Sequence, residues 1–183
     1  MRRRDHVQHV LEQWRHEAPD LDRSPMGVVG RISRLAQLLE SELEPIFAAH
    51  GVNGGEFDVL AALRRSGRPY RLKPTELSKA LMVTSGGMTK RLTALEARGL
   101  VRREPDPSDG RSTAVALTGK GKHLVETILP EHVANELRLL GELSSKERNQ
   151  LAGLLEALAV SLGDEAASSK RASAAAARRR GRG

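Results

Sequence analysis

The stretch that decides the fold is Val83–Glu96, with the sequence VTSGGMTKRLTALE. Met88, Leu92 and Leu95 recur at helical spacing, so the stretch predicts a helix with one apolar stripe. Short hydroxyls and a cation lie off the stripe: Ser85, Thr89, Lys90 and Thr93. Thr84 is the expected N-cap, because its hydroxyl can accept a hydrogen bond from a free amide of the first turn.

Gly86 and Gly87 fall in the first turn of this helix. Each glycine lowers helix stability by about 1 kcal/mol relative to alanine, which indicates that another molecule comes close to this backbone. A helix start with free amides, hydroxyls and a lysine is suited to an anion. Nucleic acid is the leading candidate, since contacts of this kind position proteins on phosphates.

A second short helix precedes this one. Residues 73–81 predict it, with Pro74 in the first turn, where a missing amide costs nothing. Leu77 and Leu81 are expected to face the apolar stripe of the following helix. Two short helices joined by a tight turn predict a helix-turn-helix.

The periodicity changes after Gly99. Residues 100–104 and 112–117 are typical of two strands, and the polar turn between them is rich in Pro, Asp and Gly. This pattern predicts a β-wing with the cation Arg111 at its tip. Asp109 is placed to pair with Arg111 and to orient it, because an exposed pair adds little stability.

Amphipathic helices flank this unit. Those expected are 5–17, 26–49, 55–65 and 119–141, the last kinked or divided at Pro130. Ser144 and Glu147 form a capping box that starts a final, leucine-striped helix. The wide apolar faces of the first and last helices favour a dimer, the alternative being that they only complete the core of a monomer.

These predictions give a fold that is mainly α with a small β-wing. The expected parts are an extra N-terminal helix (1–25), a helical dimerisation region (26–50 and 119–163), a winged helix-turn-helix DNA-binding domain (51–118) and a disordered basic tail (164–183). The tail either adds non-specific phosphate contacts or is simply solvated.

Composition limits the function classes. The 183 residues include no cysteine, which excludes disulfides and thiolate zinc sites. The net charge is +7, and the six cations after residue 165 leave +1 for the rest of the chain. The known catalytic motifs are missing, so we expect no enzyme, no cofactor and no metal site. No stretch approaches 18 apolar residues, and a cytoplasmic, nucleoid-associated protein is expected.

Two further side chains need an explanation. Asp58 lies in an otherwise apolar run, where it is either an exposed acid favoured by the helix dipole or one half of a buried Asp–Arg pair. Trp14, the only tryptophan, either anchors the first helix or lines a ligand pocket.

The order of these features resembles the MarR family of bacterial transcription regulators. The resemblance rests on Phe57–Leu60, Pro74–Leu77, Thr84–Thr89, Leu95–Arg103 and Asp106–Arg111, in family order over about residues 26–162. It implies a homodimer, triangular in outline, whose helix-turn-helix motifs enter major grooves while the wings reach minor grooves. The DNA-binding residues would then be Thr75, Thr84, Ser85, Gly86, Thr89, Lys90 and Arg111.

A narrower resemblance is to the urate-responsive branch of that family. The branch has an extra N-terminal helix with a tryptophan, and its ligand-binding pattern is matched here by Trp14, Asp58, Arg91 and Arg103. This implies a repressor that is released by urate or a related purine or aromatic anion. The alternatives are a regulator that responds to a phenolic or antibiotic-like ligand, and a nucleoid-type protein that binds DNA without sequence preference.

Overall fold

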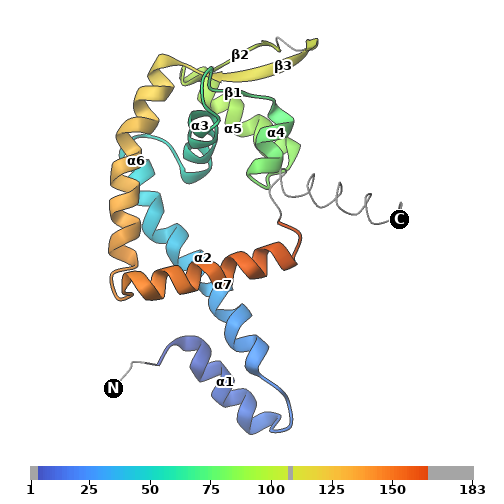
Figure 1. Cartoon of the computed structure of the whole chain (residues 1–183), viewed down its shortest axis with the longest axis vertical. Coiled ribbons are helices and arrows are strands. Elements are labelled where there is room, and N and C mark those ends of the chain that lie inside the picture. Colours follow the sequence, from blue (N-terminus) through green and yellow to red (C-terminus); the bar gives the residue numbers. More distant parts are fainter. Residues whose placement is uncertain (1–3, 107–108, 165–183) are drawn as a thin grey trace, which may run out of the picture. The chain divides into compact units, whose positions relative to one another are not determined.

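The computed structural model describes residues 4–106 and 109–164, with side chains for 4–106 and 112–164. The elements are α1 (His6–Glu17), α2 (Ser24–Ala49), α3 (Gly54–Arg65), β1 (Arg71–Leu72), α4 (Pro74–Ala80), α5 (Ser85–Ala97), β2 (Val101–Asp106), β3 (Asp109–Leu117), α6 (Gly119–Leu139) and α7 (Ser145–Ser161). The predicted fold class, mainly α with a small β-wing, is confirmed (Figure 1). Residues up to Glu136 form one compact unit and those from Leu137 a second.

The core of the first unit lies among α3, α4, α5 and the sheet (Figure 1). Met88, Leu92 and Leu95 on α5 are almost fully buried, as the stripe in the sequence predicts. Leu60 and Leu77 meet them from α3 and α4. Burying an aliphatic side chain of this size contributes roughly 1.5–3 kcal/mol, so this cluster holds the helix-turn-helix together.

The sheet has three antiparallel strands in the order β1-β3-β2, whereas the sequence predicted two. β1 was missed because it has only two residues, Arg71 and Leu72, which show no periodicity. It exists through its pairing with β3, in which Leu72 lies opposite Val115. The other two strands reach further into the wing than expected, up to Asp106 and from Asp109.

Two helix starts follow the predicted capping chemistry, and a third has a capping box that the sequence analysis did not predict. The Thr84 hydroxyl accepts from the Gly87 amide at 3.2 Å, which makes Thr84 the N-cap of α5. Ser144 and Glu147 form the expected capping box of α7. Asn53 and Glu56 form a further capping box at α3. These bonds satisfy amides that have no partner within the helix.

Pro130 does not divide α6, so of the two expected outcomes, a kink or a division, the division is wrong. Contacts on both sides of the proline support the continuous helix. Ile128 is fully buried before it. After it, the Asn135 side-chain amide donates to the Glu42 carbonyl at 3.1 Å. Tertiary packing of this kind outweighs local propensity.

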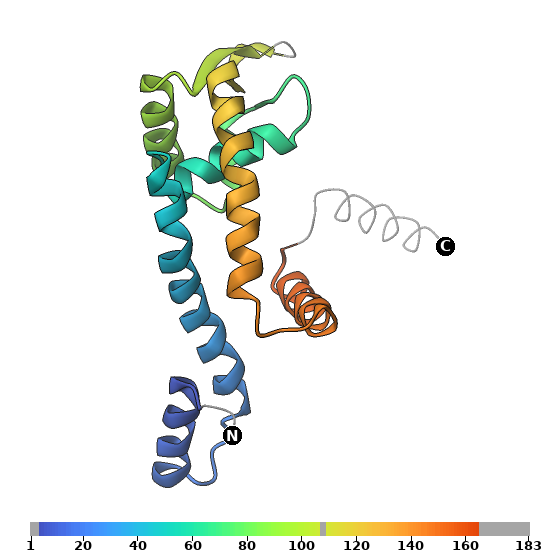
Figure 2. The ribbon, with the colours of Figure 1, turned by 90° about the vertical axis from the view of Figure 1, so that its left-hand side faces the viewer.

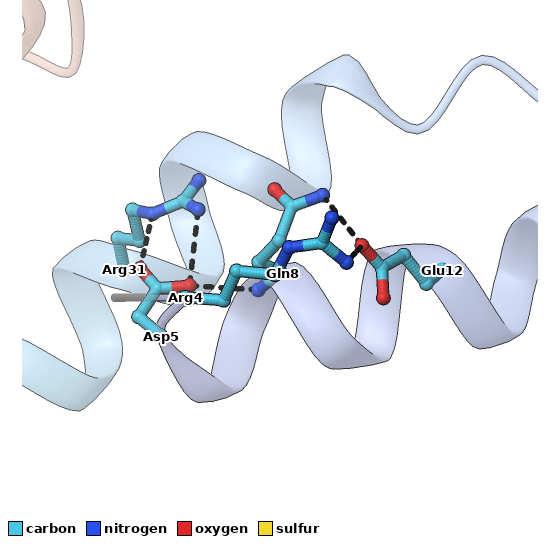
Figure 3. A network of polar contacts seen from close by, with 5 residues as sticks. All are labelled: Arg4, Asp5, Gln8, Glu12 and Arg31. Atoms are coloured by element: carbon cyan, nitrogen blue, oxygen red, sulfur yellow. Dashed lines mark hydrogen bonds and ion pairs between the residues drawn. The ribbon is translucent and has the colours of Figure 1, made fainter. Parts of the chain in front are cut away.

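α1 lies beside the first half of α2 (Figures 1 and 2). The Arg31 guanidinium donates to both carboxylate oxygens of Asp5, at 2.6 and 3.1 Å (Figure 3). Asp5 also caps α1 by accepting from the Gln8 amide, and these bonds hold the pKa of its carboxyl below the ordinary value. Gln8 and Arg4 both donate to Glu12. The polar network therefore fixes the start of α1 against α2.

Large apolar side chains remain uncovered on several helices. On α2 they are Val28, Val29, Ile32, Leu35, Leu38 and Leu39. α7 has no buried residue, and Leu154 of its leucine stripe is 64% exposed. α2 belongs to the first unit and α7 to the second, and each has an exposed apolar face.

The predicted disordered tail, 164–183, lies outside the described residues except for Asp164. Over residues 4–106 and 109–164, no helix combines the length and the apolar character that a membrane crossing requires.

Gly121 sets how closely α6 approaches the sheet. A Cβ at Gly121 would overlap the Leu100 carbonyl oxygen. Thr118 holds this approach by donating from its amide to Leu100 at 3.1 Å and from its hydroxyl to Gly99 at 2.8 Å. We therefore predict that Gly121→Ala lowers the free energy of unfolding by about 1–3 kcal/mol in urea denaturation, as overpacking does.

Gly119→Ala is the matched control, because a Cβ at Gly119 meets nothing within 4 Å. It should leave stability unchanged or raise it slightly through helix propensity. Equal stabilities of the two variants would contradict the close approach at Gly121.

Candidate functional site

α5 presents the polar face that the sequence predicted. Six of the proposed DNA-binding residues are exposed: Thr75, Thr84, Ser85, Gly86, Thr89 and Lys90. The opposite side of α5 is buried, which leaves the helix no freedom to turn another face outward. The first turn of α5 and the start of α4 therefore offer hydroxyls, a cation and backbone to a bound molecule.

The two glycines at the start of α5 differ in their surroundings. A Cβ at Gly87 would come within 2.9 Å of a Val83 methyl and 3.2 Å of the Thr84 hydroxyl, so the cap itself requires glycine there. A Cβ at Gly86 would meet nothing within 4 Å. The fold thus has no steric need for glycine at 86, and its exposed backbone suits a close approach by a ligand from outside.

Two hydroxyls on this face already form hydrogen bonds within the fold. Thr89 donates its hydroxyl proton to the Ser85 carbonyl at 2.9 Å. Its oxygen lone pairs remain available to donors such as the exocyclic amines of DNA bases. The Thr84 hydroxyl accepts from Gly87 and keeps its own proton to donate, for example to a phosphate.

The end of β2 that lies beside the wing turn is tied to the start of α4. The Lys73 ammonium lies 2.9 Å from the Asp106 carboxylate, which is almost fully buried. Two residues earlier on β2, the Glu104 carboxylate forms ion pairs with Arg71 at 3.2 Å and with Arg102 at 2.9 Å. The wing is therefore held at a defined position relative to the helix-turn-helix. The side chains of Asp109 and Arg111, and the pairing predicted between them, lie outside the described residues.

A pocket of about 760 Å³ lies behind α5. Asp58 from α3 and Arg91 from α5 both line it, so the structure brings these two predicted residues together. The Arg91 guanidinium covers Gly55, where a Cβ would come within 2.6 Å of its Cζ atom. Arg91 thus extends inward from the recognition helix toward the start of α3.

Asp58 lines this pocket and is exposed to solvent, although partial burial still affects its carboxyl. Burial among the surrounding protein atoms raises the pKa of its carboxyl, against the opposing charges of Arg91, Arg65 and His132. Among the described residues it makes no hydrogen bond or ion pair, so the attraction of Arg91 acts over a longer range. Asp58 is exposed and makes no close ion pair with an arginine among the described residues, and these were the two features that the sequence interpretations contrasted.

The pocket is also lined by residues that the sequence did not predict for a site. Its lining is completed by Ala36, Leu39, Glu40, Leu43, Glu44, Phe47, Asn53, Gly54, His132 and Glu136. The His132 ring lies 5.3 and 5.2 Å from the rings of Phe47 and Phe57, and its Nε2 is 3.3 Å from Glu136. Only the spacing of His132 and Glu136 by four residues on one helix was available as a signal.

Trp14 and Arg103 lie elsewhere in the same chain. Arg103 on β2 forms an ion pair with Glu96 at 3.2 Å and does not line the pocket. Leu11 of α1 lies beside Gly27 of α2, and Trp14 is nearly one turn closer than Leu11 to the C-terminal end of α1. On α2, the pocket begins only at Ala36, which is ~14 Å along the helix axis from Gly27. Trp14 is 43% exposed and touches no part of the pocket of its own chain.

Comparisons with known proteins agree with this architecture. A MarR family model matches residues 50–112. The transcriptional regulator PecS of Dickeya dadantii is 40% identical over 149 residues, covering 81% of this chain and 90% of PecS. The structure of Sco3205 from Streptomyces coelicolor in complex with DNA has a TM-score of 0.71 at 27% identity, covering 79% of this chain and 91% of that chain. A mutant MarR from E. coli complexed with operator DNA has a TM-score of 0.64 at 25% identity, covering 79% and 96%.

The raised pKa of Asp58 has a consequence for stability. The native state keeps this proton to higher pH than the unfolded chain, so the ionised carboxylate opposes folding as pH rises above its ordinary pKa of 3.8. We predict that Asp58→Asn melts at a higher temperature than the wild type at pH 7. The difference should narrow as pH falls through the raised native pKa and vanish well below 3.8, because the carboxyl is then protonated in both states.

Asp22→Asn serves as the control of opposite sign. Hydrogen bonds from Ser24 lower the pKa of Asp22, so its loss should reduce the melting temperature at pH 7 and matter less in acid. A melting temperature of Asp58→Asn at or below that of the wild type at pH 7 would contradict the assignment.

Proposed function

Since the chain belongs to the MarR family of DNA-binding transcriptional regulators, which are not enzymes, we propose that it represses its target genes as a homodimer and is released by a small aromatic anion such as urate. The observation that carries the proposal is the double use of α5. Its exposed first turn is suited to DNA, while Arg91 on the same helix extends into the pocket beside Asp58. A protein that acts on chromosomal DNA in this way works in the cytoplasm.

The uncovered apolar faces support the homodimer. Leu154 and Leu158 on α7, and Leu35 and Leu38 on α2, are each at least one third exposed in a single chain. Contiguous apolar faces of this extent usually mark contacts between proteins. A symmetric dimer covers the same patch on both chains and gives two helix-turn-helix motifs related by a two-fold axis.

On DNA, the N-terminal turn of α5 would enter the major groove. Ser85, Gly86, Thr89 and Lys90 would face base edges and nearby phosphates, with Lys90 directed at guanine acceptors. Thr75 and Thr84 would contact phosphates, and Arg111 of the wing would enter the narrow minor groove. Two-fold symmetry requires a pseudo-palindromic operator with half-sites about 10 bp apart. A dimer on such a site represses by covering promoter DNA.

The pocket would take the effector. Of its lining residues, only Arg91 and His132 can carry a positive charge, so a planar anion would pair with Arg91. Asp58 would lose the opposing charge that favours its ionised form and would face a new negative charge. The repulsion would move Arg91, and α5 with it. A coupling of roughly 1–3 kcal/mol changes DNA affinity several- to about a hundredfold.

Trp14 and Arg103 would have different roles in the response to the effector. α1 lies at the far end of α2 from the pocket of its own chain, so Trp14 would stack on the effector only if it came from the second protomer. Arg103 would act after the α5 movement, since its ion pair with Glu96 joins β2 to the end of α5.

The first test concerns the DNA face. We predict that Gly86→Ala folds with equal or slightly higher stability but binds operator DNA at least tenfold more weakly, because a methyl group would obstruct the backbone approach. The effect corresponds to the ~1–3 kcal/mol typical of one lost groove contact. The measurement is a gel-shift titration on an operator selected from random duplexes.

Gly119→Ala is again the matched control, since it adds the same methyl at an open helix start on α6, away from the first turn of α5. It should bind like the wild type. Wild-type affinity of Gly86→Ala would mean that this face does not meet DNA. Failure to select any palindrome against excess random DNA would instead favour a nucleoid-type protein.

The second test concerns the effector. We predict that urate at millimolar concentration releases the wild type from its operator and quenches the fluorescence of Trp14. Arg91→Gln should lower urate affinity at least tenfold, because the anion loses its cation. Xanthine and salicylate, added separately, define the ligand class.

Arg102→Gln is a suitable control, because Arg102 is an exposed arginine on β2 that does not line the pocket. Its urate response should match that of the wild type. Release by salicylate but not by urate would replace the urate proposal with a regulator of the phenolic class.

A further inference from the structure

Met82 is the most exposed large apolar side chain in the part of the chain that the structure describes. Its exposed fraction is 85%, and it lies in the turn between α4 and α5. Its neighbours differ, since Leu81 and Val83 are both partly buried against the core. The turn therefore anchors its two flanking residues and leaves the Met82 side chain outside.

The backbone at Met82 is also in a conformation that side chains disfavour. Its φ is 50°, in the left-handed region that glycine and asparagine tolerate best. Tyr70, with φ 59°, is the only other non-glycine residue of this kind among those described. Tyr70 uses its side chain within the fold, because its ring lies under the Arg64 guanidinium at 5.0 Å and packs on the core. Met82 has no such contact.

The fold does not need a side chain at this position. The turn is closed by backbone bonds, from the Val83 amide to the Ser78 carbonyl at 3.0 Å and from the Met82 amide to the Lys79 carbonyl at 3.4 Å. Glycine would make the same bonds without the strain. Strain that the fold itself does not require tends to occur at functional sites.

The location of Met82 indicates the function. Its Cα is two residues from that of Thr84, at most ~7.6 Å away, and three residues from Ser85. In helix-turn-helix proteins the first helix crosses the DNA backbone while the start of the second contacts base edges. The turn between them therefore lies at the edge of the major groove.

We propose that Met82 is a DNA-contacting residue that packs its thioether against the apolar edge of the major groove. The apolar groups there are the deoxyribose carbons and the C5 methyl of thymine. An unbranched thioether adapts to such an irregular surface. The inference rests on the proposed placement of α5 in the major groove.

Three variants test the contact. Met82→Gly and Met82→Asn suit the backbone but lack the apolar group, so both should melt at or above the wild-type temperature and bind the operator about tenfold more weakly. Met82→Leu keeps the apolar group and should bind within about twofold of the wild type. Wild-type affinity of the glycine and asparagine variants would overturn the proposal.

An independent measurement uses the wild-type protein and so does not depend on how the variants fold. Hydrogen peroxide oxidises exposed methionines to sulfoxides, which mass spectrometry of peptides resolves by position. Operator DNA should slow the oxidation of Met82 at least fivefold. Met26, which is 37% exposed and lies near the start of α2, is the internal reference and should react at the same rate with and without DNA. Unchanged oxidation of Met82 in the complex would overturn the contact.

An operator with deoxyuridine in place of thymidine separates the two apolar groups. Weaker binding by the wild type but not by Met82→Gly assigns the contact to the thymine methyl, whereas unchanged binding by both assigns it to the sugar. Failure of the proposed function is distinguishable, because the wild type would then bind no operator at all. Tight operator binding with a reactive Met82 would contradict only this inference.

Discussion

Burial of the apolar stripe on α5 is the interaction on which the rest of the structure depends. Met88, Leu92 and Leu95 are each at most 2% exposed, so the helix cannot rotate about its axis without exposing all three. Because successive helical residues are ~100° apart, this packing also decides where every other side chain of α5 points. Thr89 and Lys90 are turned outward, and Arg91 lies at the border of the stripe, toward α3.

One rigid helix therefore carries the residues of both proposed contacts, the one with DNA and the one with an effector. The backbone that carries Arg91 beside the pocket also carries Ser85 and Gly86. The pocket is also well supported, since Asn53 and Glu56 cap α3 and Glu44 accepts from the Gly54 amide at 3.0 Å. In the proposed mechanism, these supported walls leave α5 as the element that responds when the charge beside Asp58 changes. The wing is joined to α5 by the ion pair of Arg103 and Glu96, and to the start of α4 by the pair of Lys73 and Asp106.

The sequence was sufficient where local chemistry decides the structure. The periodicity of α5, the Thr84 cap and the capping box at Ser144 depend only on residues a few positions apart, and all were predicted. β1 and the continuity of α6 at Pro130 depend on contacts across the fold, which no local pattern contains. The same distinction holds for the residues of the pocket. Polarity and the family resemblance were enough to predict Asp58 and Arg91. His132 lines the pocket because of where α6 runs, and Trp14 is far from it because of how α1 packs on α2, and neither arrangement can be predicted from local sequence.

The contact between Gly55 and Arg91 has a consequence for how effector preference can change. A single methyl group at residue 55 would occupy the space of the guanidinium and displace it, because the end of a long side chain moves more easily than backbone. The pocket would lose its strongest positive charge although every ionisable residue remained in the chain. Selectivity for an anion over a neutral compound can therefore be lost or regained during evolution through the volume of an uncharged residue. Relatives with identical charged residues around this pocket need not share an effector.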